Sequence, residues 1–255
     1  MRSALATLAV LLLVELGAGC SAEDGSDTDP SSFEGVPWVL SAGIDVEGWE
    51  KVAPSASFDG ERVGGSTGCN RYGASYTIDG DKLEIGEIAQ TLIACTSPAD
   101  AVERDYLAAF QRVDGWRTED EELVLVDSGE AELLRFRAGM PEGSWLVTGL
   151  LRQSDKALVS PLAGTEITAS LDEDGALAGS AGCNQYTTTY TAERGVIEIT
   201  PRSVTEMLCT EPDGVMEQEV AYLDALSKAA RYRVDAGSLE LLDAGGTTIV
   251  MFQRA

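Results

Sequence analysis

Cysteine is the residue type in this chain whose spacing most clearly implies chemistry. Cys69 and Cys95 lie 26 positions apart, and the same spacing separates Cys183 from Cys209. In an oxidising compartment such thiols form disulfides, whereas in a reducing one they more often bind metals or act in catalysis. Four cysteines allow three pairings, so the choice among them depends on how the chain is organised.

Histidine is absent from the 255 residues, and its absence excludes several chemistries. A Ser-His-Asp or Cys-His nucleophile, an imidazole metal site and a histidine pH switch all need this residue type. The 43 acidic residues outnumber the 18 basic ones and give a net charge of −25. Because phosphate backbones repel such a chain, we expect no nucleic-acid partner. We also expect no metal ion and no other cofactor.

The N-terminus has the pattern of an export signal. Arg2 precedes an apolar run over residues 4–14, which is shorter than the ~20 apolar residues that span a bilayer. The sequence Gly17-Ala18-Gly19-Cys20 then resembles the lipobox of bacterial lipoproteins. This resemblance implies a lipoprotein signal peptide over residues 1–19 and acylation of the Cys20 thiol. The alternative is an ordinary secretory peptide that leaves Cys20 as a free thiol.

Residues 20–32 are expected to form a disordered acidic tether. This segment has four carboxylates, no basic residue and no large apolar side chain, so it cannot offset its own ordering entropy. Acyl chains on Cys20 would hold such a tether at a membrane, with each buried methylene contributing ~0.8 kcal/mol. We therefore expect an exported, membrane-anchored protein of the cell envelope, facing the periplasm or the cell surface.

The rest of the chain consists of two copies of one sequence repeat. Gly68-Cys69-Asn70-Arg71-Tyr72 aligns with Gly182-Cys183-Asn184-Gln185-Tyr186, and the same offset then relates many later residues. A repeat of this length is a whole domain. We predict tandem domains over residues 33–138 and 143–255, joined by a short Gly- and Pro-containing linker. Each copy should then carry its own disulfide, Cys69 with Cys95 and Cys183 with Cys209, although unbridged buried thiols remain the alternative.

Each unit reads as strands, then one helix, then two further strands. Alternating segments such as residues 72–78 and 82–88 flank Asp-Gly turns, which is typical of hairpins. Ser97-Pro98-Ala99-Asp100 predicts a helix start with a capping serine and proline in the first helical position. Apolar residues then recur at helical spacing: Val102, Tyr106, Leu107, Phe110 and Val113 in the first helix, and Val220, Leu223 and Leu226 in the second. The fold class is therefore α+β and β-rich, with a curled antiparallel sheet and one main helix per domain.

These motifs together resemble the META domain, the family that includes the bacterial heat-shock protein HslJ. The resemblance rests on Gly-Cys-Asn-x-Tyr at residues 68–72 and 182–186, on the segments ending at Cys95 and Cys209, and on the Tyr-Leu pair of each helix. It implies compact META-type domains, often on envelope lipoproteins and loosely tied to stress responses. It implies no reaction and no catalytic residues.

The repeated motif has a functional and a structural interpretation. In the functional one, Asn70 and Tyr72 together with Asn184 and Tyr186 line a shared binding surface. In the structural one, which we favour, glycine permits positive φ, cysteine forms the disulfide and asparagine caps a turn with its side chain.

Two hypotheses for the function of the whole chain are compatible with these sequence features. The first is a noncatalytic envelope lipoprotein whose tandem domains bind or scaffold an envelope protein or ligand. The alternative is a glycosidase-like hydrolase, which needs paired carboxyl groups about 5 to 9.5 Å apart. Acidic clusters occur at residues 119–122 and 172–174 but are not reproduced between the copies, and neither continues into a calcium-binding loop. This favours solvated turns over an active site.

Overall fold

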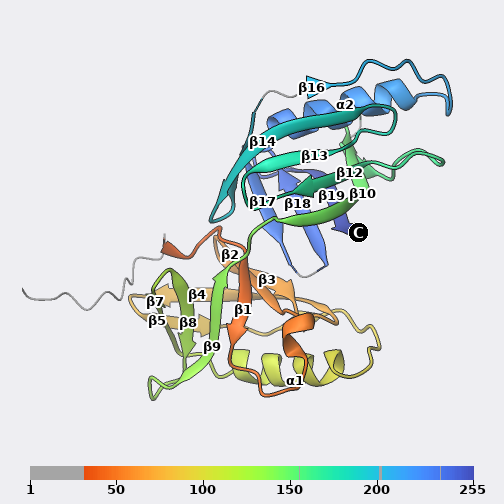
Figure 1. Ribbon diagram of the computed structural model, residues 1–255. Coiled ribbons are helices and arrows are strands. Elements are labelled where there is room, and N and C mark those ends of the chain that lie inside the picture. The colour runs from red at the N-terminus through yellow and green to blue at the C-terminus, as the bar shows by residue number, and fades with distance from the viewer. Residues whose placement is uncertain (1–31, 155, 201–202, 236) are drawn as a thin grey trace, which may run out of the picture.

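The computed structural model describes residues 32–154, 156–200, 203–235 and 237–255 (Figure 1). The expected signal peptide, most of the expected tether and Cys20 lie outside the described residues. Two domains follow one another along the chain, and each is a curled sheet with one α-helix. The predicted fold class is confirmed.

The first domain contains nine strands, a short 3-10 helix η2 and helix α1. Its elements are β1 (Trp38–Ala42), η2 (Trp49–Lys51), β2 (Ser55–Asp59), β3 (Arg62–Ser66), β4 (Arg71–Asp79), β5 (Lys82–Ile85), β6 (Ala89–Gln90), α1 (Ala99–Phe110), β7 (Gly115–Glu119), β8 (Glu122–Val126) and β9 (Glu132–Ala138). All pairings are antiparallel in the order β3-β2-β1-β9-β8-β7-β5-β4-β6, and β3 also pairs with β4. The sheet is therefore closed, and β6 is added to β4 outside the ring.

The second domain repeats this closure. Its elements are β10 (Gly143–Arg152), β11 (Ala157–Val159), β12 (Thr168–Leu171), β13 (Ala176–Ser180), β14 (Gln185–Glu193), β15 (Val196–Ile199), β16 (Ser203–Val204), α2 (Val215–Lys228), β17 (Arg231–Val234), β18 (Ser238–Leu242) and β19 (Thr248–Arg254). β10 pairs with both β12 and β19, which closes the ring, while β11 and β16 are added to β10 and β14. The two domains thus share one topology, apart from the added strand β11.

Alternation along the strands fills each ring with apolar side chains. In β4 the buried residues Tyr72, Ala74 and Tyr76 alternate with partly or fully exposed ones, as a strand with one face on a core requires. Trp38 in the first domain and the matching Trp145 in the second are both fully buried. Each domain therefore has its own hydrophobic core.

Three strands, not two, follow each helix. The additional strands are β7 and β17, which pair with β8 and β18. Strand β7 has little apolar patterning beyond Trp116, and its hairpin turn uses Asp120 and Glu121 at positive φ. Because that turn lacks the Asn-Gly or Asp-Gly signal of a tight hairpin, the sequence pattern did not reveal it.

The helices pack one face on the sheet and lie at opposite ends of the molecule (Figure 1). Val102, Tyr106 and Phe110 are the buried residues of α1, as the spacing predicts. In α2 the expectation for Val220 is wrong, since its side chain is 65% exposed. The buried face includes Glu219 instead, because its carboxylate has partners inside the domain.

The predicted serine cap of the first helix is also wrong. Pro98 occupies the N-cap position of α1, where its carbonyl accepts the N–H groups of Ala101 and Val102, and no side chain caps the helix. The second helix begins at Val215 after Gly214, which has φ +84°. In both domains a tight backbone turn leads into the helix and takes the place of a side-chain cap.

The domains touch along one side through contacts from β14–β15 and β17–β18. Arg194 lies over the ring of Trp38 at 5.4 Å, a cation–π distance. The hydroxyl of Tyr232 donates to the carbonyl of Gly139 in the linker, at 3.0 Å. Among the described residues, two ion pairs also cross between the domains, Arg71–Asp235 at 3.7 Å and Arg233–Asp59 at 3.2 Å.

Candidate functional site

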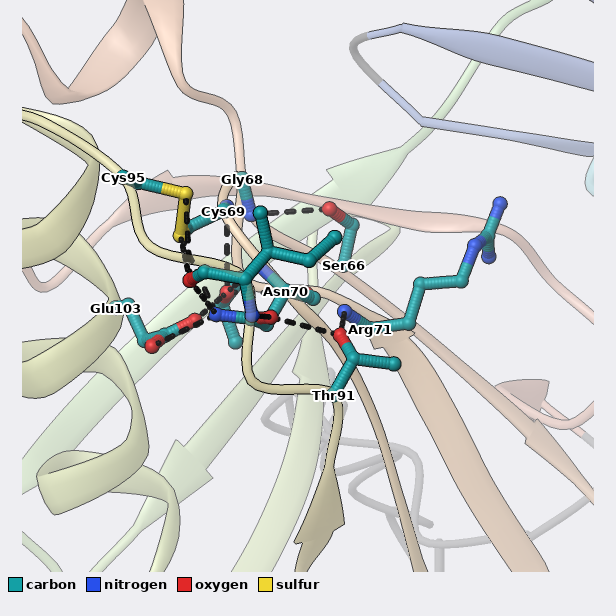
Figure 2. The surroundings of a disulfide bond; sticks show 10 residues. Ser66, Gly68, Cys69, Asn70, Arg71, Thr91, Cys95 and Glu103 are labelled. Atoms are coloured by element: carbon teal, nitrogen blue, oxygen red, sulfur yellow. Dashed lines mark hydrogen bonds between the residues drawn. A yellow bond between two sulfur atoms is a disulfide. The ribbon is translucent and has the colours of Figure 1, made fainter.

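The Gly-Cys-Asn motif of the first domain forms the turn between β3 and β4. Gly68 has φ +86°, a conformation that favours glycine, and in the second domain Gly182 has φ +104°. This turn brings Cys69 to the segment that leads into α1, where it is bonded to Cys95 (Figure 2). Cys183 and Cys209 are bonded in the same way, with Cα atoms 6.0 Å apart against 5.9 Å in the first pair. Each copy therefore carries its own disulfide.

Asn70 joins this turn to the segment before Cys95. Its Oδ1 accepts the hydroxyl of Thr91 and the backbone N–H of Ile93, both at 2.7 Å. Its Nδ2 donates to the carbonyl of Ile93 at 3.1 Å and to a carboxylate oxygen of Glu103 at 3.2 Å (Figure 2). The side chain thus does more than cap a local turn, because its partners lie more than twenty residues away.

Asn184 makes the same set of bonds in the second domain. Its Oδ1 accepts from the hydroxyl of Thr205 at 2.8 Å and from the N–H of Met207 at 2.7 Å. Its Nδ2 donates to the carbonyl of Met207 at 3.0 Å and to Glu219 at 2.9 Å. The disulfide and the asparagine therefore fix the same segment in each copy.

Glu103 and Glu219 are the members of this site that sequence reasoning missed. Each stands three residues before the tyrosine of its helix, so the repeat itself held the signal. Glu219 is 5% exposed, an unusual burial for a carboxylate that is explained by its bonds to Asn184. Apolar spacing along a helix does not mark a charged residue as part of its buried face.

The two copies differ by one hydroxyl in how the glutamate is bound. In the first, Thr67 accepts the N–H of Asn70 at 2.8 Å and donates to Glu103 at 2.5 Å. In the second, alanine stands at the matching position 181, and Glu219 accepts the N–H of Asn184 directly at 2.7 Å. In the first copy the hydroxyl of Thr67 connects the N–H of Asn70 to Glu103, an arrangement that we call the threonine relay. In the second copy the bond is direct, and in both copies the glutamate is linked to the turn.

A pair of buried tyrosines lies beside each disulfide turn. The hydroxyls of Tyr72 and Tyr106 are 2.7 Å apart, and those of Tyr186 and Tyr222 are 2.8 Å apart. Burial raises the pKa of all four phenols, and for Tyr186 to about 12. These phenols are therefore neutral near neutral pH.

The four residues named as a binding surface are thus buried. Asn70, Tyr72, Asn184 and Tyr186 are between 1% and 6% exposed, and their polar atoms have partners inside their own domain. This geometry supports the structural interpretation of the motif. Tyr72 also borders a cleft between the domains.

The acidic clusters lie in hairpin turns. Glu119 and Glu122 flank the β7–β8 turn, and both are paired with Arg135, at 2.8 and 3.3 Å. Hydrogen bonds from Arg117 and from Arg135 lower the pKa of Glu119. Residues 172–174 form the exposed turn between β12 and β13, where Asp174 accepts the N–H of Ala176. Asp120, Glu121 and Glu122 border a cavity of about 400 Å³, which Arg194 of the second domain also lines.

The cleft that Tyr72 borders has a volume of about 430 Å³ and is lined by both domains. Its walls from the first domain are β2, β3 and β4, and the β17–β18 hairpin provides the opposite side. Arginines from both domains lie in it, together with three carboxylates: Arg62, Arg71, Arg233, Asp59, Asp235 and Glu240. A volume of this order suits a small-molecule ligand.

The described residues contain neither a cluster of metal-ligating side chains nor a membrane-spanning helix. No group of three or more histidine, cysteine, aspartate or glutamate side chains in residues 32–154, 156–200, 203–235 and 237–255 could hold a metal ion. No helix of the same ranges is both long and apolar enough to cross a membrane. The two disulfides fit an oxidising, exported compartment.

Comparison with known proteins places the chain in a family. Two solved structures are similar: one of a protein from Burkholderia xenovorans, with 28% identity, 45% of this chain and 82% of that chain covered and a TM-score of 0.38, and one of a DUF4847 family protein from Bacteroides vulgatus, with 16% identity, 45% and 93% covered and a TM-score of 0.32. No curated protein matches. The sequence model of the META domain matches twice, over residues 31–140 and 138–255. The chain therefore belongs to the META domain family and carries two copies of that domain in tandem.

Proposed function

We propose that the protein is a noncatalytic binding module of the cell envelope, in which the tandem META domains hold a ligand in the cleft between them. One observation carries this proposal: the cleft is lined by both domains, whereas the repeated polar residues of each domain are buried and bonded internally. Domain pairs commonly place binding sites at such a junction. In this proposal the Gly-Cys-Asn motif makes each domain rigid, and the binding site forms where the two domains meet.

The carboxylates of the cleft favour binding over hydrolysis. Asp59 and Asp235 are each paired with an arginine of the other domain. The Oδ1 of Asp235 also accepts the backbone N–H groups of Gly237 and Ser238, at 2.9 and 2.8 Å. Both carboxylates thus already have cationic or N–H partners, which does not match the acid–base pair that a glycosidase needs.

The proposed location is the membrane surface of the envelope, through acylation at Cys20. The lipobox resemblance and the acidic residues 21–32 support an anchor followed by a spacer. We further propose a role in envelope stress, which the family resemblance supports. Mass spectrometry of the membrane fraction should find the N-terminal peptide acylated at Cys20. An unmodified mature protein in the soluble fraction would contradict the anchor.

A photo-crosslinker tests the binding site in cells. The photoreactive residue replaces Glu240, which lines the cleft, or Glu173, which lies in the exposed β12–β13 turn and serves as the control. After illumination, intact-mass measurement should show a defined adduct on the Glu240 variant and none on the Glu173 variant. Absence of an adduct at position 240, or the same adducts at both positions, would overturn the cleft as the binding site.

A further inference from the structure

The cleft brings together three arginines of a chain that is strongly acidic overall. Arg62, Arg71 and Arg233 line it, although the chain has only 18 basic residues and a net charge of −25. Three carboxylates share the cleft, so its overall charge is balanced. The distribution of contacts among these groups then decides which of them remain available to a ligand.

Two of the guanidinium groups are available. Among the residues that the structure describes, Arg62 is exposed and makes no ion pair. Arg71 is 57% exposed at its side chain, donates to the hydroxyl of Ser238 at 3.3 Å and lies 3.7 Å from Asp235, a long contact for an ion pair. The Arg71 side of this pair faces solvent, where an ion pair contributes little stability, whereas the Asp235 side chain is only 15% exposed. The cost of a change of partner by Arg71 therefore depends on what else binds Asp235.

Asp235 does not depend on Arg71. The backbone N–H groups of Gly237 and Ser238 already satisfy its Oδ1. If Arg71 turns to a ligand, this carboxylate keeps two hydrogen bonds. The third arginine, Arg233, pairs with Asp59 at 3.2 Å and is 45% exposed, so it is the most firmly held of the three.

The cleft floor leaves room beside these arginines. Ser57, Gly64 and Gly73 lie opposite one another on β2, β3 and β4. A Cβ at Gly73 would lie 3.7 Å from the carbonyl oxygen of Val63 and 3.8 Å from Nη2 of Arg62. Both are ordinary contact distances, so packing does not require glycine there. The matching residue of the second domain is Thr187. Glycine inside a strand weakens it and often marks a place where a ligand approaches closely.

From this geometry we infer that the cleft binds a small ligand carrying an oxyanion, a carboxylate or a phosphate, through the guanidinium groups of Arg62 and Arg71. The planar fork of arginine matches both oxyanions with two parallel hydrogen bonds. The body of the ligand lies on the floor at Gly64 and Gly73. This inference rests on the proposed binding function, which it deepens by naming the ligand class.

The test uses the full chain and two probes, citrate for carboxylates and pyrophosphate for phosphates. Each is titrated at low salt into labelled protein while the amide signals of Gly64 and Gly73 are followed by NMR. At least one probe should give saturable shifts at these amides, and the stronger probe identifies which oxyanion the cleft prefers. No saturable shift with either probe would overturn the inference.

Three variants assign the binding to the cleft. R62Q and R71Q should each weaken binding by about tenfold, because each removes a charged hydrogen-bond donor. Arg104 is exposed on α1 and pairs with its neighbour Asp105, so R104Q makes the same charge change elsewhere and should leave binding unchanged. Equal weakening by R104Q would show a general charge effect and contradict the site.

G73T fills the floor with the side chain that the second domain carries at this position. It should abolish the shifts while the melting temperature stays at or above that of the parent protein. Unchanged probe binding by a folded G73T would also overturn the inference. Because the crosslink from position 240 does not depend on the oxyanion, that adduct would persist if the ligand class were wrong, and it would be lost if the binding function itself were wrong.

Discussion

Glu219 binds both nitrogen groups of one residue, Asn184. One carboxylate oxygen lies 2.9 Å from the side-chain Nδ2 and the other lies 2.7 Å from the backbone N. Both partners are buried, so water cannot replace either bond cheaply. The helix, the disulfide turn and the segment fixed by Asn184 are therefore held by a single carboxylate.

Removing this carboxylate should destabilise the second domain more than the matching change destabilises the first. E219A removes the acceptor of the backbone N–H of Asn184 and one of the two oxygen acceptors of its Nδ2, so we expect a loss of about 2 to 4 kcal/mol. E103A should cost about half as much, because Thr67 still accepts the N–H of Asn70. Hydrogen exchange measured by mass spectrometry reports the two domains separately.

Exchange of peptides in the unmodified domain is the internal control for each variant. Peptides of the first domain should exchange unchanged in E219A, and peptides of the second should do so in E103A. Equal losses in the two domains would show that the threonine relay has no energetic effect.

The relay itself can be tested by a double-mutant cycle on Thr67 and Glu103. T67A reproduces the alanine of the second copy, so Glu103 can accept the N–H of Asn70 directly, and the loss should stay below about 1 kcal/mol. In the T67A background, E103A should then cost as much as E219A does. Urea unfolding of the four proteins gives the coupling energy. Additive effects of the two changes would contradict the relay.

The repeat made much of this architecture predictable from sequence. The offset between Cys69 and Cys183 indicated two domains and their separate disulfides, and the helix spacing placed Tyr106 in the core. What the sequence pattern could not show were contacts formed by polar residues across the fold. Glu219 has the signature of an exposed helix residue, and its burial follows only when the turn containing Asn184 packs against the helix.

The cleft between the domains could not be predicted from the sequence pattern. It depends on the β17–β18 hairpin lying against β2–β4, a contact between domains that no periodicity within one domain encodes. The local signal was Gly73, which stands where the second copy has Thr187. A difference between copies was informative here, whereas the shared residues had structural roles.

Each disulfide should stabilise its own domain. Closing a loop with a sequence separation of 26 contributes about 3 kcal/mol in the chain-entropy model. C95S should therefore speed hydrogen exchange in the first domain and leave the second unchanged, and C209S should do the reverse. Non-reducing peptide mapping of the parent protein is expected to recover Cys69–Cys95 and Cys183–Cys209 peptides. A peptide that links Cys69 to Cys183 would contradict the assignment.

The buried tyrosine pairs should make stability fall at high pH. Burial raises the pKa of Tyr186 to about 12, whereas a phenol in the unfolded chain has a pKa of ~10. Between these values the unfolded chain binds fewer protons than the folded one, so stability decreases by ~1.4 kcal/mol per pH unit for each such tyrosine. Below the lower value this contribution is fully present and does not change with pH.

Y186F isolates one member of the pair. Phenylalanine cannot ionise, so the fall in unfolding free energy between about pH 10 and about pH 12 should be shallower in Y186F than in the parent protein, by the contribution of one phenol. Urea unfolding at several pH values measures both slopes, and tyrosinate absorbance confirms that the folded phenols stay protonated. Equal slopes in the two proteins would mean that the hydroxyl of Tyr186 reaches solvent in the folded state, against its burial beside Tyr222.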